Sequence, residues 1–285
     1  MSILWFIDLI KWVINNYNIG RWKMAKEFCL DVEGGNLFCK IEKAGDNAPW
    51  VIFSNSFVTD MSIWNAQALA LSKRYNVLRY DQRGHGKSTY STDPLNFDML
   101  GDDVLAVLDY LSIQECTFVG LSMGVPTGLR AYQQEPDRFE KLVFVDGMAR
   151  TAPTGAAAWQ ERIDFVKDKG IKEFANVTAD RWLQEDTRKS DKGKILTNMM
   201  STTSVDGFIQ CARALQSYDY ADIVPTINIP LLAIAGAKDG AMPAAMQKTF
   251  SAVANVQIKT IDNAGHIPNF ERPDAFNAVL NKFLE

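Results

Sequence analysis

The sequence has little of several things that mark specialised proteins. It contains only two histidines and four cysteines in 285 residues, and no two cysteines have the spacing of a metal or Cys-x-x-Cys redox site. It has no run of basic residues, and acidic and basic residues are intermixed at a net charge of -4. The sequence therefore contains no basic patch that could bind the phosphate backbone of a nucleic acid, which excludes that class of partner. No metal and no organic cofactor is predicted.

Because so few cysteines are present, we expect free thiols, a reducing compartment and a cytoplasmic location. Cys29 and Cys39 are the one candidate pair for a disulfide, since they flank a predicted Gly34-Gly35 turn and could approach across a hairpin. The register of that hairpin is ambiguous by one residue, so a disulfide there stays open. Cys116 and Cys211 have no neighbouring cysteine in the sequence.

Residues 1–24 also lack what a signal peptide needs, a basic start and a small-residue cleavage site. The segment is too short and too interrupted by charge to span a bilayer. Drawn as a helix, its apolar side chains cover well over half of the circumference. Three interpretations stay open: a helix packed on the body or on a second copy of the chain, a helix lying in a membrane interface, and a loose leader.

From residue 25 onward, apolar runs typical of strands alternate with segments of helical spacing. A hairpin is predicted around Gly34-Gly35, followed by a strand in "PWVIFSNS" that is apolar enough to be buried on both faces. Strands that alternate with helices pair in parallel through crossovers. The sequence therefore predicts an α/β fold with a doubly wound, mostly parallel sheet.

The alternation stops between "LVFVDG" and "IPLLAIAG", where residues 147–222 contain several helical stretches and no convincing strand. We interpret this segment as an inserted helical cap, and residues 25–146 and 223–285 as the core. The insertion follows the carboxyl end of a strand, which is the edge where open α/β sheets bind ligands. The helices are therefore expected to cover a site.

The pentapeptide "GLSMG" at residues 120–124 directly follows a predicted strand and precedes a predicted helix. Gly-x-Ser-x-Gly in this context is the pattern of a nucleophile elbow, a turn so tight that side chains beside the serine would collide. Gly120 and Gly124 avoid this collision because they have no side chain, and Ser122 is expected to be exposed at the sheet edge. Ser122 is therefore the candidate nucleophile.

A serine hydroxyl needs a base, and the chain offers two histidines. The elbow architecture requires the chain order serine, acid, histidine, which selects His266 and leaves His85 as a loop-shaping residue. The acid must orient the imidazole. Asp239 follows the strand before the His266 strand and is favoured, while Asp146, at the end of the strand before the insertion, is the rival.

Acyl transfer also needs donors aimed at the developing oxyanion. The backbone N–H of Met123, which opens the helix after the nucleophile, is one candidate. The backbone N–H of Phe57, in the loop after "VIFSNS", is the other. Both donors belong to the backbone, so truncation of a side chain would not remove them.

With these residues in place, the chain resembles the α/β-hydrolase superfamily from residue 25 to its end. The blocks "SNSFVTDMSIWNAQ", "YNVLRYDQRGHGKS", "FVGLSMG" and "IDNAGHIPNFERPDAF" are similar to those of 3-oxoadipate enol-lactonases, bacterial enzymes of aromatic-compound breakdown. The resemblance implies a triad of Ser122, Asp239 and His266. The chain departs from the family at Val125-Pro126, where a second glycine is usual, and at Asp146-Gly147, where an asparagine-threonine pair is usual.

The departures bear on the substrate. Arg150, at the start of the insertion, could pair with a substrate carboxylate, as the enol-lactone interpretation requires. Trp159 and Trp182 make the insertion apolar enough to favour a hydrophobic acyl chain or ring, although such residues more often serve packing. These three are the predicted substrate-binding residues, and the expected partner is a small ester or lactone.

The sequence thus predicts a serine hydrolase that cleaves an ester or lactone through an acyl-enzyme on Ser122. An enol-lactonase of aromatic catabolism, an N-acyl-homoserine lactonase and a short-chain carboxylesterase are the candidate activities. Two alternatives from other classes stay open: a cofactor-independent oxygenase, which would keep the His-Asp pair, and a non-catalytic binding module on the same fold.

Overall fold

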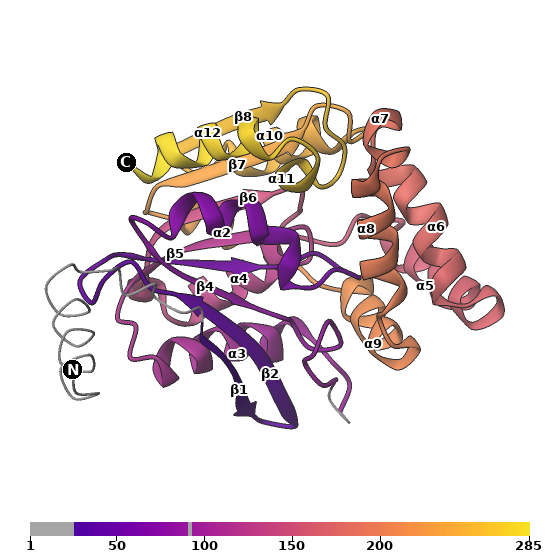
Figure 1. The fold of residues 1–285 in the computed structure, drawn as a ribbon, viewed down its shortest axis with the longest axis horizontal. Coiled ribbons are helices and arrows are strands. Elements are labelled where there is room, and N and C mark those ends of the chain that lie inside the picture. The colour runs from indigo at the N-terminus through magenta and orange to yellow at the C-terminus, as the bar shows by residue number, and fades with distance from the viewer. Residues whose placement is uncertain (1–25, 91–92) are drawn as a thin grey trace, which may run out of the picture.

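A computed structural model of the chain describes residues 26–90 and 93–285, so the predicted N-terminal helix over 1–24 lies outside the described residues. The described part contains one eight-stranded sheet with the order β1-β2-β4-β3-β5-β6-β7-β8 (Figure 1). The first two pairings, β1 with β2 and β2 with β4, are antiparallel, and all the others are parallel. The predicted doubly wound sheet is confirmed. Its strands are β1 Lys26–Val32, β2 Gly35–Glu42, β3 Trp50–Ser54, β4 Asn76–Tyr80, β5 Cys116–Leu121, β6 Phe139–Val145, β7 Leu231–Gly236 and β8 Val256–Ile261.

The register of the first hairpin decides the question of the disulfide. Cys29 lies opposite Phe38, and Phe28 lies opposite Cys39. Successive side chains of a strand point to opposite faces, so the two cysteines lie on different faces of the hairpin. Cys29 is exposed, Cys39 is buried, and all four cysteines are free thiols, as expected.

Helices cover both faces of the sheet, and each face buries its own apolar cluster. On one face, η1, α2 and α12 pack through Trp64, Leu71 and Phe276, which share a cluster with β3, β5 and the inserted helices. On the other face, α3, α4 and α10 contribute Leu108, Leu129 and other side chains of the second cluster. The central strands are apolar on both faces because both faces are covered. The bounds of the helices outside the insertion are η1 Met61–Trp64, α2 Asn65–Leu71, α3 Phe97–Tyr110, α4 Gly124–Gln134, η2 Pro136–Arg138, η3 Val224–Thr226, α10 Met242–Phe250, α11 Pro268–Glu271 and α12 Pro273–Leu284.

The segment between β6 and β7 is helical, as predicted, and its helices gather at one end of the sheet (Figure 1). The pairs α5 with α9 and α6 with α8 make its main contacts. The sequence did not predict α7, because its four residues "EDTR" are all polar and show no helical period. The bounds are α5 Gly155–Lys169, α6 Ile171–Trp182, α7 Glu185–Arg188, α8 Asp191–Ser201 and α9 Val205–Gln216.

None of the helices in residues 26–90 and 93–285 is long and apolar enough to cross a bilayer.

Candidate active site

Ser122 lies in the tight turn between β5 and α4, with a φ of 53°, a backbone conformation that is uncommon for a residue with a side chain. The flanking glycines are required by close backbone approaches. A Cβ at residue 120 would lie 2.3 Å from the Gly124 carbonyl oxygen, and a Cβ at residue 124 would lie 2.8 Å from the Ser54 carbonyl oxygen. The turn therefore has the geometry of a nucleophile elbow, with strain at the serine held by its surroundings.

Two loops at the carboxyl edge of the sheet bring His266 and Asp239 to this serine. His266 follows β8, and its Nε2 lies 3.0 Å from Ser122 Oγ. Its Nδ1 lies 2.7 Å from Asp239 Oδ2, in the turn after β7. Since the carboxylate can only accept, Nδ1 carries the proton and Nε2 is free to accept the proton of Ser122. The three side chains form one chain of hydrogen bonds.

Asp146, the rival acid, lies at the same edge in a different arrangement. It follows β6, its side chain is fully buried, and both of its carboxyl oxygens accept from the Gly236 N–H, at 3.0 and 3.1 Å. No hydrogen bond joins Asp146 to His266 in the described part of the chain. The geometry thus favours Asp239 over Asp146 as the partner of the imidazole.

The pKa values of the two carboxyl groups shift in opposite directions. Burial raises the pKa of Asp146 well above its usual range, and the negative charge of Asp239 adds to the effect. Burial would also raise the pKa of Asp239, but its hydrogen bond with His266, the charge of that ring and the interaction with the nearby Asp146 carboxyl group bring this pKa below its usual value. Asp239 is therefore ionised at neutral pH, as an acid that orients an imidazole must be.

The two residues predicted to supply backbone donors, Phe57 and Met123, line the same pocket. Phe57, in the loop after β3, and Met123, at the start of α4, line one pocket with Ser122 and His266. No group in the described residues accepts a hydrogen bond from either N–H. Unpaired buried N–H groups are uncommon, so both donors are available to an incoming oxyanion.

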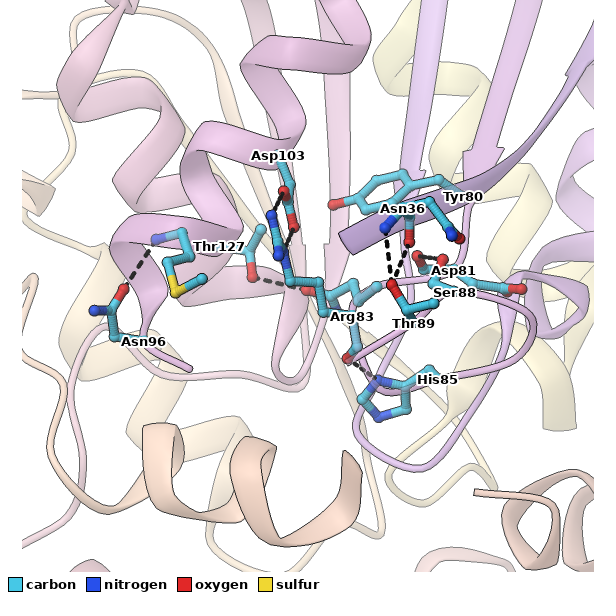
Figure 2. Close-up of polar contacts among 12 residues, drawn as sticks. Asn36, Tyr80, Asp81, Arg83, His85, Ser88, Thr89, Asn96, Asp103 and Thr127 are labelled. Atoms are coloured by element: carbon cyan, nitrogen blue, oxygen red, sulfur yellow. Dashed lines mark hydrogen bonds and ion pairs between the residues drawn. The ribbon is translucent and has the colours of Figure 1, made fainter. Parts of the chain in front are cut away.

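His85, the second histidine, supports the loop after β3 that contains Phe57 and Val58. Its Nε2 accepts from the Val58 N–H at 2.8 Å, and its Nδ1 donates to the Arg83 carbonyl at 3.0 Å. Arg83 forms a buried, bidentate ion pair with Asp103, with both N···O distances at 2.7 Å (Figure 2). Burial lowers the pKa of His85 to about 4, so the ring is neutral near pH 7. Its contacts are those of a loop-shaping residue.

The pocket above Ser122 has a volume of about 460 Å³ and includes all three predicted substrate-binding residues. The centroids of the Trp182 and His266 rings lie 4.8 Å apart, and Trp159 packs edge-on against Phe57 with their centroids 5.0 Å apart. The Arg150 side chain is exposed, and the backbone of this residue pairs with that of Asp219 in an isolated antiparallel β-bridge. The inserted helices therefore supply one wall of the pocket, and the sheet edge supplies the other.

Two further arginines on that wall were not among the predicted residues. Arg162 and Arg181 line the pocket from α5 and α6, and burial followed by the charge of Arg181 lowers the pKa of Arg162. None of Arg150, Arg162 and Arg181 has a carboxylate within ion-pair distance in residues 26–90 and 93–285. The spacing of Arg162 three residues after Trp159, on one helix face, is a signal that could have identified it.

Asp146, Asp239 and His266 place ligand atoms within 4.8 Å of one another, which is the spacing of a metal site. These atoms already satisfy one another and the Gly236 N–H, and His266 faces Ser122 with its other nitrogen. The donor set is therefore suited to proton transfer from a serine rather than to an ion.

Comparisons with known proteins identify the family of the chain. Residues 49–273 match the family described as alpha/beta hydrolase fold. The chain is similar to 3-oxoadipate enol-lactonase 2 of Acinetobacter baylyi, with 34% identity over 82% of this chain and 90% of that protein. It is also similar to a putative carbamate hydrolase RutD of Caulobacter sp., with 28% identity over 82% and 90% of the two chains. The crystal structure of the enol-lactonase from Burkholderia xenovorans LB400 superposes with a TM-score of 0.85 and 33% identity, over 90% of this chain and 99% of that one.

Proposed function

The chain belongs to the α/β-hydrolase family, and on that premise we propose that it hydrolyses a small ester or lactone through an acyl-enzyme on Ser122. The observation that carries the proposal is the chain of hydrogen bonds from Ser122 through His266 to Asp239, at the tip of a strained elbow. Enol-lactonase relatives support the reaction class.

In the first half of the reaction, Ser122 Oγ attacks the carbonyl carbon as its proton passes to His266 Nε2. The carbonyl oxygen takes the negative charge and accepts hydrogen bonds from the N–H groups of Phe57 and Met123. Asp239 stabilises the imidazolium that forms. The tetrahedral intermediate then collapses, the bond to the leaving oxygen breaks, and that oxygen takes the proton from Nε2.

In the second half, a water molecule gives its proton to His266 Nε2 and attacks the acyl carbon. The intermediate collapses, Oγ leaves and recovers the proton, and a carboxylate product is released. With a lactone, the leaving oxygen and the acyl group belong to one molecule, so a single hydroxy acid or its keto tautomer leaves the site. The pocket wall of inserted helices must then admit and release that product.

The unpaired arginines favour a substrate that carries an anionic group. Arg150, Arg162 and Arg181 surround one pocket with no carboxylate paired to any of them in the described residues. The charge of Arg181 disfavours the charged form of Arg162, and a bound carboxylate would offset this repulsion through charge-assisted hydrogen bonds. This favours a carboxylate-bearing lactone or ester over a neutral alkyl ester.

The acyl-enzyme is tested by rapid mixing with p-nitrophenyl acetate. We expect a burst of p-nitrophenol that approaches one equivalent per chain, because acylation by an activated serine outpaces hydrolysis of the acyl-enzyme with such esters. Ser122→Ala should remove the burst, whereas Ser251→Ala, at an exposed serine at the end of α10, should keep it. A full burst in folded Ser122→Ala would refute the assignment of the nucleophile.

A further inference from the structure

The chain carries a second buried carboxyl group beside the proposed acid, and the proposed reaction does not use it. Asp146 follows β6, Asp239 follows β7, and these strands are neighbours in the sheet. One carboxyl oxygen of each residue and a ring nitrogen of His266 lie within 4.8 Å of one another. Asp146 is fully buried.

Two carboxylates at this separation, with no cation between them, cannot both be charged without a large cost. A proton on one of the two carboxyl groups removes this repulsion and supplies a hydroxyl that can donate to the other group, because an ionised carboxylate only accepts. Asp239 is held in its charged form by His266 Nδ1, whose N–H it accepts at 2.7 Å. This proton therefore belongs to Asp146.

The surroundings of Asp146 fit a neutral carboxyl group. It has one fixed donor, the Gly236 N–H, and no arginine, lysine or histidine forms an ion pair with it in the described residues. The charged groups that act on it are Asp239 and, more weakly, Glu271, both of which disfavour ionisation. Arg181 acts on Asp239 rather than on Asp146.

We propose that Asp146 is a protonated carboxylic acid whose hydroxyl donates to the Asp239 carboxylate and so positions Asp239 against His266. The Asp146 carbonyl oxygen meanwhile accepts from the Gly236 N–H, which fixes the group to β7 just before the turn that carries Asp239. Asp146 is thus a positioning residue. Its effect on turnover rests on the proposed hydrolase function, but its protonation does not.

Two variants, Asp146→Asn and Asp146→Gly, test whether Asp146 donates to Asp239 and accepts from Gly236. Asparagine keeps the shape, donates through its amide N–H₂ and accepts from Gly236 with its carbonyl oxygen. Glycine removes the side chain and suits the positive φ of 41° at this position. We expect Asp146→Asn to keep kcat/KM within about threefold, and Asp146→Gly to lose about 10- to 100-fold, as for a lost hydrogen bond to a charged group.

The pH profile separates positioning from mere packing. In Asp146→Asn the acid limb of the kcat/KM profile should stay where it is, because no charge has been removed. An ionised Asp146 would instead stabilise the charged imidazole of His266, so its removal would move that limb by about one pH unit to lower pH. Such a shift would overturn the proposal, and so would a loss of activity in Asp146→Asn as large as in Asp146→Gly.

An infrared difference spectrum tests protonation without any substrate. At pH 8, Asp81 and Asp103, whose pKa values burial raises to about 6, are ionised. The wild type minus Asp146→Asn spectrum should then show the C=O stretch of a protonated carboxyl group, and this band should move to lower frequency in D₂O. A carboxylate doublet instead would overturn the proposal even if the protein is an active hydrolase, and the protonated band would support it even if Ser122 proved inert.

Discussion

At the scale of single residues, the polar groups around the site are arranged so that each holds one protonation state. Asp239 accepts from His266 and stays charged, while His85 must stay neutral because its Nε2 accepts from the Val58 N–H. Val58 itself has a φ of 55° and directly follows Phe57, one of the proposed oxyanion donors. The buried imidazole therefore fixes the backbone on which one of these donors depends.

This arrangement predicts a loss of stability at low pH. Burial lowers the pKa of His85 to about 4, from an ordinary value of about 6.5 in the unfolded chain. The unfolded state therefore binds the extra proton first, so the free energy of unfolding falls as the pH drops from about 6.5 to about 4. The loss attributable to His85 is about 3 kcal/mol. Urea unfolding at pH 7 and at pH 4 measures it.

The matched variant is His85→Gln, whose amide oxygen can accept from the Val58 N–H but does not titrate. Asp81 and Asp103 act in the opposite direction. Burial raises their pKa values to about 6, so the folded state binds these protons before the unfolded state does, and the free energy of unfolding rises as the pH falls. Both proteins contain these carboxyl groups, so the difference between their pH dependences isolates His85. Equal losses in the two proteins would contradict the assignment.

At the scale of elements, the inserted helices are tied directly to the loop that carries the proposed base. The His266 N–H donates to the Trp182 carbonyl at the end of α6 at 3.0 Å, and a Cβ on Gly265 would lie 2.0 Å from that oxygen. Phe57 packs against Trp159 of α5 and Phe208 of α9. A shift of these helices would therefore change the positions of His266 and of Phe57, one of the proposed oxyanion donors.

The same helices carry the charges that we expect to select the substrate. Arg162→Met and Arg181→Met should each lower kcat/KM about 10- to 100-fold for a phenyl half-ester of a dicarboxylic acid, because each removes a hydrogen bond to a charged group. The neutral phenyl ester of matched length should change little. Arg188→Met, on α7 outside the pocket and paired with Asp180, is the control. Equal losses on both esters would argue against a carboxylate subsite.

At the scale of the whole molecule, the hydrophobic periodicity of the sequence and the order of its motifs were sufficient to predict the architecture. The central strands were predictable because both faces of the sheet are covered there, which leaves near-continuous apolar runs in the sequence. The proximity of Ser122, His266 and Asp239 was predictable because a parallel sheet brings the carboxyl ends of its strands to one edge. Arg162, Arg181 and the neutral state of Asp146 were not, because they depend on how helices and neighbouring strands pack in space.

The most direct test of the account is intact-mass analysis of the purified protein after reaction with a fluorophosphonate probe, beside Ser122→Ala. An activated serine should gain the mass of one phosphonyl group in the wild type, and Ser122→Ala should gain none. Labelling of both proteins would place the reactive group elsewhere. Labelling of neither, under conditions where the wild type is folded, would contradict a serine activated by His266 and Asp239.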